Sequence, residues 1–409
     1  MINITTSYFY NFIAVQYEAS EVERHEILNQ FPPPQLPNSD EFFDIQSATS
    51  GDYIKARFLL NDFQVALTKT NKQFLKISFS NNFGSISAKM WDNQGAVDRN
   101  VPLLESYSVF DIEGIVDEFN GNKSLTVNVL KPCQDNVNPF SLLPYTQQSI
   151  EELTVELFSY LNELQSPFKE ICYGAMNRFW DQFRIRPAAK GYHHNYLGGL
   201  LKHTIGLMRF ARYVLKLEDN PFQAVIKLIN VVEKVYKQEL WSGFQNDDLK
   251  NLVWKDTIDH LYRMLQGMMS YKESNPNYDL IMTSILYHDI GKLMEYDHAG
   301  KSFDDFQFLY PTADSSGLQN RKQSGITMDE LGVMVGHIPY GVLLLSKIIE
   351  AENISVTLEE IHHMTHCILC HHGLPEWGSC VRSPQTLEGY IIHIVDYLDS
   401  RYENTEKIK

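Results

Sequence analysis

The chain has 409 residues, a length that predicts two or three domains rather than one. Its 51 acidic side chains outnumber its 35 basic ones, and the net charge of -16 argues against indiscriminate binding to nucleic acid or to an anionic membrane. The small, odd number of cysteines disfavours a disulfide-built secreted fold. The N-terminus lacks a basic and apolar leader, and no apolar run approaches the roughly 20 residues of a membrane helix. We therefore expect a cytoplasmic protein with no membrane partner.

A β-domain is predicted over residues 46–135, after an N-terminal arm or linker at 1–45. In the arm, residues 21–30 suit a short helix, and the proline-rich stretch that follows would end it. Between Ile54 and Leu130, apolar side chains recur at every second position in five short segments, which predicts five strands. Five short strands in such a span favour a small barrel, with the five-stranded OB barrel as the leading candidate.

The outward positions of the predicted barrel carry cations interleaved with aromatic rings. The residues concerned are Arg57, Phe74, Lys76, Lys89 and Trp91. Charge for phosphates and flat rings for bases are what a single-strand nucleic-acid face needs. An ordinary exposed sheet surface shows the same alternation, so the spacing alone supports both interpretations about equally.

Beyond a linker at residues 136–148, the periodicity becomes helical and predicts an all-α domain over 149–409. A capping box at Ser149–Glu152 marks its start. Extra helical sequence at about 217–277 predicts an insertion in this domain, and the stretch at about 296–328 predicts a second one.

Histidine and aspartate recur beside the apolar segments of the helical domain. A single histidine of this kind, such as His260, His298 or His393, is usually a core residue bonded to a neighbour. The set is different, because several separate helical segments that bring His or Asp inward are costly for a core unless something binds them. Imidazole and carboxylate ligands suit a divalent transition metal, with Mn²⁺ as the first choice and Co²⁺, Fe²⁺ or Ni²⁺ as alternatives. The candidate ligands are His203, His288, Asp289, His337, His371, His372 and Asp396.

The order of four of these residues, His203, His288-Asp289 and Asp396, resembles the HD-domain metallophosphohydrolases. Longer motifs resemble the YhaM-type 3′–5′ exoribonucleases, a family that joins an OB barrel to an HD domain. These motifs are Thr70–Lys76, Ala88–Asp92, Ala188–Thr204, His288–Lys292, Val335–Ile338, Ile368–Ser379 and His393–Asp399. The resemblance strengthens the nucleic-acid interpretation of the barrel face.

The resemblance implies a multidomain α+β protein in which an OB barrel precedes an all-α HD domain. The implied activity is metal-dependent 3′–5′ hydrolysis of single-stranded RNA, with single-stranded DNA as a further substrate, to nucleoside monophosphates. Asp289 would bridge two metal ions, Lys292 would offset charge on the phosphate, and His194 would contact substrate or metal. The implied metal sites are His203, His288, Asp289 and Asp396 for one ion, and Asp289, His337, His371 and His372 for the other.

Three alternatives stay open on the sequence alone. The first is an HD hydrolase of a small nucleotide, in which the barrel serves assembly. The second is a nucleic-acid-binding protein that keeps a vestigial HD fold, and the third is a DNA-processing protein of a mobile element. The long interval from His203 to His288 and the acidic charge balance keep these alternatives open. A homo-oligomer is a further possibility that the sequence leaves open.

Overall fold

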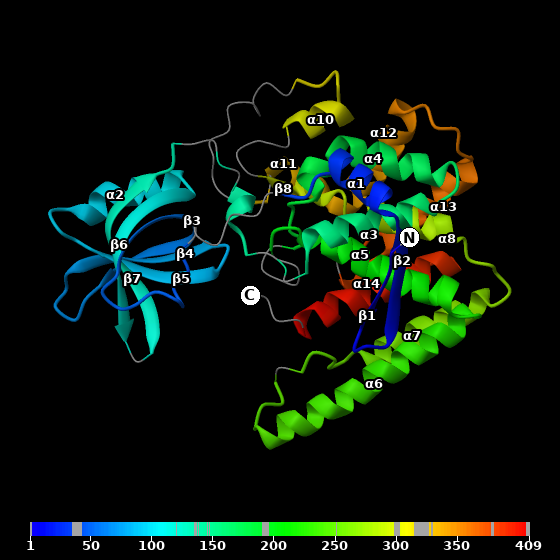
Figure 1. The fold of residues 1–409 in the computed structure, drawn as a ribbon, viewed down its shortest axis with the longest axis horizontal. Coiled ribbons are helices and arrows are strands. Elements are labelled where there is room, and N and C mark those ends of the chain that lie inside the picture. Colours follow the sequence, from blue (N-terminus) through cyan, green and yellow to red (C-terminus); the bar gives the residue numbers. More distant parts are fainter. Residues whose placement is uncertain are drawn as a thin grey trace.

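A closed β-barrel and a larger helical body make up the computed structural model of the chain (Figure 1). The structure describes residues 2–34, 43–119, 121–134, 137, 139–144, 146, 148–189, 196–250, 252–297, 303–314, 327–328, 330–377 and 380–405. The predicted fold class, a five-stranded barrel followed by an all-α domain, is confirmed.

The barrel has the strand order β3-β4-β5-β7-β6, closed by pairing of β6 with β3. All neighbours are antiparallel except β5 and β7, which pair in parallel, and helix α2 (Ala96–Ser106) connects β5 to β6. This is the order of an OB barrel. Alternate side chains such as Phe58, Leu75 and Phe110 fill its interior. The strands are β3 (Tyr53–Leu67), β4 (Gln73–Asn81), β5 (Gly84–Trp91), β6 (Val109–Phe119) and β7 (Asn122–Pro132).

The N-terminal segment, expected to be an arm or linker, is folded onto the helical body. Strands β1 (Ile2–Tyr8) and β2 (Ile13–Ala19) form an antiparallel hairpin, and α1 (Glu21–Gln30) follows with the expected bounds. Burial alternates along β2, and its inward side chains join the core of the helical body rather than that of the barrel. Residues 2–31 are therefore part of the helical body in space, although the barrel separates the two in sequence.

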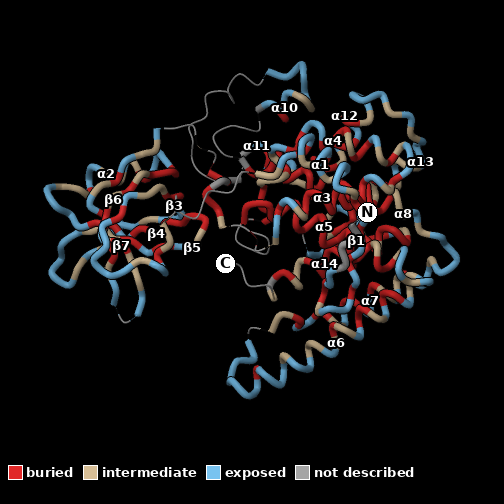
Figure 2. Tube along the Cα trace, in the orientation of Figure 1, coloured by how far each residue is buried: buried red, intermediate tan, exposed pale blue. Residues whose placement is uncertain are grey.

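The helical body is organised around α8, which packs against α4, α5, α12, α13 and α14. Every residue of α8 from Leu280 to His288 is buried (Figure 2). The helices of this body are α3 (Ile150–Asn162), α4 (Phe168–Phe183), α5 (Gly199–Arg212), α8 (Tyr278–His288), α9 (Lys292–Glu295), α11 (Glu330–Val335), α12 (His337–Ala351), α13 (Leu358–Cys370) and α14 (Leu387–Tyr402).

The stretch expected as an insertion at about 217–277 contains α6 (Pro221–Gln245) and α7 (Ile258–Met268). Helix α7 packs against α14, while the far end of α6 extends away from the body into solvent (Figures 1 and 2). The second longer stretch contains α10 (Phe303–Leu309) and a short pairing of β8 (Tyr296–Asp297) with β9 (Thr327–Met328). Within the described ranges, no helix is both long and apolar enough to cross a membrane.

Candidate metal centre and adjoining cavity

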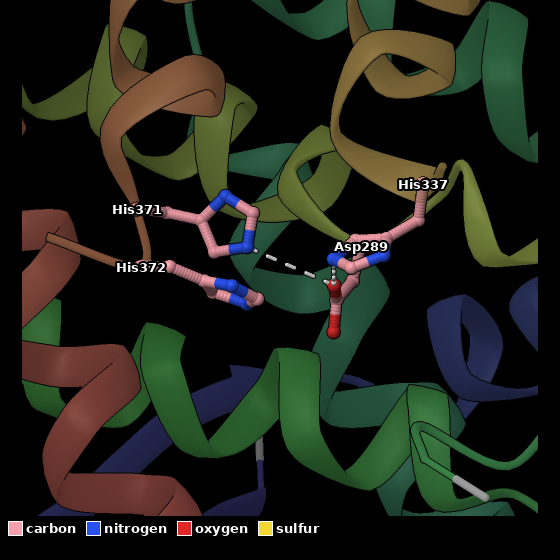
Figure 3. Close-up of side chains that lie close together, drawn as sticks. All are labelled: Asp289, His337, His371 and His372. Atoms are coloured by element: carbon pink, nitrogen blue, oxygen red, sulfur yellow. Dashed lines mark ion pairs between the residues drawn. The ribbon is translucent and has the colours of Figure 1, made fainter. Parts of the chain in front are cut away.

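The seven predicted metal ligands lie at the meeting point of five helices. His203 lies on α5, and Asp396 lies in the middle of α14. The others lie at helix ends: His288 is the last residue of α8 and Asp289 follows it, while His337 is the first residue of α12. His371 and His372 follow α13, and in Figure 3 they approach Asp289 from the side opposite His337.

The position of Asp289 depends on a close backbone approach at the next turn. A Cβ atom on Gly291 would lie 1.9 Å from the carbonyl oxygen of His337, so only glycine lets this turn meet the start of α12. The approach brings the carboxylate of Asp289, which directly follows α8, to the first residue of α12. The Gly of the His-Asp-Ile-Gly segment is thereby explained by packing.

The carboxylate of Asp289 lies between two groups of imidazoles. Its Oδ2 is 3.4 Å from Nε2 of His288 and 3.6 Å from Nε2 of His203. Its Oδ1 is 3.6 Å from Nε2 of His337 and 3.9 Å from Nε2 of His371. Ligand atoms within 4.8 Å of one another form two groups that share Asp289: His203, His288 and Asp289, and Asp289, His337, His371 and His372. Such sharing suits a carboxylate that bridges two ions.

Hydrogen bonds at Nδ1 orient four of the histidines. The Nδ1–H of His203 donates to Asp399 (2.7 Å), and that of His337 donates to Glu295 (2.8 Å). The other two donate to backbone carbonyls: His288 to that of Ile285 (2.6 Å) and His371 to that of Ile368 (2.7 Å). Each bond leaves the Nε2 lone pair directed at the centre. Metal-binding histidines are held in this way by an acceptor behind the ring.

The buried polar atoms at the centre fit a cation. Among the described residues, Oδ1 of Asp289 and Nε2 of both His337 and His371 are buried and have no hydrogen-bond partner. Buried polar atoms without partners are costly, and here three of them face a common point. A divalent metal would satisfy all three, so the residues present fit the group that the sequence implied.

The electrostatics favour the protonation states that a metal requires at three of the proposed ligands, Asp289, His371 and His372. Burial alone would raise the pKa of Asp289, but the charge of Lys292 holds it well below the usual value. Burial lowers the pKa of His371 well below its usual range and that of His372 to about 4. An ionised carboxylate beside neutral imidazoles is the ligand state for a transition metal. At His203, burial alone would lower the pKa, but the hydrogen bonds to Asp396 and Asp399 raise it to about 10, so this ring would lose a proton when a metal binds.

The N-terminal hairpin reaches the layer of residues behind the ligands. The hydroxyl of Tyr8, at the end of β1, donates to Oδ1 of Asp399, and the other oxygen of Asp399 accepts from His203. A Cβ atom on Gly206 would lie 1.9 Å from Oδ1 of Asp399 and 2.9 Å from the Tyr8 hydroxyl oxygen, so glycine makes room for this contact. Neither Tyr8 nor Asp399 is among the ligands predicted from the sequence.

A cavity of about 340 Å³ opens beside the centre. It is lined by His203, Asp289, Lys292, His372, Trp377, His393, Asp396, Tyr397, Ser400 and Arg401. The aromatic and arginine side chains of this wall were missed by the sequence analysis, although Trp377 lies within a motif that it singled out. The sequence signal that could have identified this part of the cavity is Trp377, which lies five residues after His372.

Two of the histidines assigned as single core residues contact each other. Nε2 of His260, on α7, lies 2.7 Å from Nε2 of His393, whose Nδ1–H donates to the carbonyl of His371. Burial lowers the pKa of both rings, that of His260 to about 3. Both rings thus have hydrogen-bond partners within the protein, as expected for core histidines. His298 and the candidate substrate contact His194 lie outside the described residues.

The barrel face brings together four of its five predicted residues. Phe74 is the cross-strand partner of Trp91, with ring centroids 5.4 Å apart, and Lys76 is the partner of Lys89. The Lys89 ammonium lies 5.6 Å from the Trp91 ring centroid. Arg57 lies apart from them, on the half of β3 that pairs with β6, and makes two bonds of 2.7 and 3.0 Å to the Asp111 carboxylate there.

Part of the helical body matches a known protein family. Residues 257–401 match the model of the HD domain family, and the match includes Asp289 and Asp396 but begins after His203. This match and the His/Asp centre together support a hydrolase.

The more particular similarity is to proteins named 3′–5′ exoribonuclease YhaM. The chain is 22% identical to the one from Listeria welshimeri over 355 residues, which is 86% of each chain. It is 23% identical to that of a Geobacillus species (strain WCH70) over 354 residues, 86% of this chain and 83% of the other. Identity to that of Bacillus subtilis is 22% over 354 residues, 86% of each chain. The predicted resemblance to YhaM-type proteins is thus confirmed.

Proposed function

We propose that this protein is a metal-dependent 3′–5′ exonuclease that hydrolyses single-stranded RNA to nucleoside monophosphates. The observation that carries the proposal is the Asp289 carboxylate, which lies between two groups of imidazoles with their Nε2 atoms directed toward it. Shared carboxylates of this kind occur in two-metal phosphodiester hydrolysis. The names of the YhaM relatives support RNA as the substrate.

Each ligand has a proposed place. His203, His288 and Asp396 would complete the site of one ion with Asp289, and Oδ1 of Asp396 lies 3.2 Å from Nε2 of His203. The second ion would be held by Asp289 and the remaining ligands, His337, His371 and His372. When bound, divalent ions polarise the phosphate and lower the pKa of water. Imidazole ligands disfavour Mg²⁺ and Ca²⁺, so the proposed metal is a transition ion, with Mn²⁺ as the first candidate.

Lys292 supplies positive charge at the wall of the cavity. Its ammonium donates to Oδ2 of Asp289, and the side chain is buried. Burial alone would lower the pKa of Lys292, but Asp289 raises it, so the ammonium stays charged. In this place it would offset negative charge on the phosphate as the bond to the leaving oxygen breaks.

The barrel face of Phe74, Lys76, Lys89 and Trp91 would hold the single strand ahead of the cavity. Rings with cations beside them bind strands with little dependence on sequence. Arg57 contributes less to this face because it lies apart from the other four residues, on the half of β3 that pairs with β6.

The substrate class is tested by incubating the purified chain with Mn²⁺ and 5′-labelled single-stranded RNA, single-stranded DNA or duplex RNA. We expect a ladder that shortens from the 3′ end of the single-stranded RNA and disappears with a chelator. An RNA whose 3′ end is paired in a stem is the matched control. Intact strands together with hydrolysis of a nucleoside triphosphate would overturn the proposal in favour of a small-nucleotide hydrolase.

A further inference from the structure

The cavity beside the metal centre has a second wall that no proposed ligand explains. The lining includes the ligands His203, Asp289 and Asp396, and beside them Trp377, Tyr397, Ser400 and Arg401, which we call the second wall. A substrate whose phosphate lies at the metal ligands would extend along this second wall. The chemistry of the wall therefore indicates which group of the substrate lies next to the phosphate.

The wall presents an aromatic surface to the cavity. The Trp377 ring lies nearly parallel to that of Tyr397, at an interplanar angle of 24° and a centroid distance of 6.1 Å. Tyr397 is buried, whereas Trp377 is 48% exposed, so the indole is the accessible ring. An exposed indole at the edge of a polar cavity offers a stacking surface for a planar ligand group.

Helix α7 supports this surface through His260. His260, on α7, places its ring centroid 4.6 Å from that of Trp377 and 4.5 Å from that of Tyr397. Its Nε2 contacts His393, which is itself bonded to the carbonyl of His371. The indole is thus backed by rings that are fixed to the same segment as the metal ligands.

Arg401 adds a cation to the wall. Its guanidinium carbon lies 3.5 Å from the centroid of the Tyr397 ring. Unlike Lys292, which is bonded to Asp289, Arg401 has no hydrogen-bond or ion-pair partner within the part of the chain that the structure describes. A guanidinium stacked on a ring keeps its N–H groups free for a planar or tetrahedral oxyanion.

We infer that this wall is the subsite for the terminal nucleotide of the strand, with Trp377 stacking on its base and Arg401 binding its 5′-phosphate. The inference rests on the proposed function, in which that nucleotide leaves as a nucleoside monophosphate. A stacking ring and a free guanidinium together match the two ends of such a product. Because stacking is tolerant of base identity, the subsite takes any of the four nucleotides.

The subsite is tested by calorimetry on the full chain with Mn²⁺, with adenosine 5′-monophosphate and adenosine as the two probes. Trp377→Leu should weaken both probes about tenfold, the usual effect of one lost stack. Arg401→Gln should weaken the monophosphate about tenfold and leave adenosine within about twofold, with Arg401→Lys between the wild type and Arg401→Gln. Trp241→Leu is the matched control, since Trp241 is 63% exposed on α6.

Kinetics on labelled single-stranded RNA separate this inference from the proposed function. Trp377→Leu should raise KM about tenfold with little change in kcat, because stacking acts alike before and during the reaction. RNA that is shortened equally well by both folded variants, with unchanged probe binding, would overturn the subsite but not the nuclease. No shortening of RNA by the wild type, together with the expected probe pattern, would overturn the nuclease and leave the nucleotide subsite in place.

Discussion

At the level of single residues, the centre depends on which nitrogen of each histidine carries the proton. The candidate ligands were identified from the sequence because His and Asp beside apolar segments are conspicuous. The groups that orient them were not, because two are backbone carbonyls, of Ile285 and Ile368, and carry no sequence signal. Asp399 and Glu295 do have a signal, but an acidic residue near a motif is too common to be assigned a role by spacing alone.

Asp399 gives a test of this orientation at one residue. Asp399→Asn keeps the shape of the side chain but removes the charge that supports His203, so Mn²⁺ affinity should fall about 10-fold or more. Calorimetric titration with Mn²⁺ measures the change. Asp98→Asn, an exposed change on α2 of the barrel, is the control and should leave the affinity unchanged. Equal affinities for both variants would show that the Asp399 charge does not act on the centre.

At the level of elements, the N-terminal hairpin is the part that the sequence analysis did not anticipate. Its turn contains Phe9, Tyr10 and Asn11 with positive φ, where hairpin signals normally involve glycine. The turn is held by tertiary contacts: Phe9 is fully buried against the ring of Phe210, and the Trp254 indole donates to the Tyr10 hydroxyl (2.7 Å). A local pattern could not predict it, because its stability comes from residues more than 200 positions away.

The hairpin offers a matched pair of tyrosines. Tyr8 donates to Asp399 behind the metal ligands, and Tyr17 donates to Glu152 (3.2 Å), which is part of a cluster with Arg24 rather than of the centre. Replacing either by Phe should cost stability by about 0.5–1.5 kcal/mol, the net value of one hydrogen bond. Only Tyr8→Phe should also weaken Mn²⁺ binding. Thermal unfolding and Mn²⁺ titration of both variants measure the two effects, and identical Mn²⁺ affinities would contradict the role of the hairpin.

The barrel was predicted more completely, because two-residue periodicity in strands is a local property. The five strands lie where alternation placed them, while their closed order required the structure. Alternation also could not show which outward residues lie close together. Arg57 lies on the half of β3 that pairs with β6, whereas the other four lie on β4 and β5.

The role of the barrel face is tested at Trp91, which is 40% exposed. Trp91→Ala should weaken binding of a single-stranded oligonucleotide by about 1–3 kcal/mol, the usual loss for one stacked base. Tyr107→Ala removes a ring of similar exposure, 41%, that lies on the barrel outside this face, and should have little effect. Fluorescence anisotropy with a labelled strand gives both affinities. Equal affinities for Trp91→Ala and the wild type would make the face an ordinary exposed surface.

At the level of the whole molecule, segments far apart in sequence build one centre. Its candidate ligands span His203 to Asp396, the hairpin contributes Tyr8, and helix α7 places His260 beside Trp377 and Tyr397 of the cavity lining. Sequence order located the ligands because each carries its own motif. The partners of α7 and of the hairpin depend on how the chain folds back on itself, and no spacing rule encodes that.

The most direct test of the account uses Asp289, the residue that both ligand groups share. The full chain and its Asp289→Ala variant are compared for Mn²⁺ content and for shortening of 5′-labelled single-stranded RNA, with circular dichroism to verify the fold. We expect two bound ions per chain and a 3′-end ladder for the wild type. The folded variant should lose the bound Mn²⁺ and produce no ladder. A folded Asp289→Ala variant that shortens RNA at the wild-type rate would contradict this account.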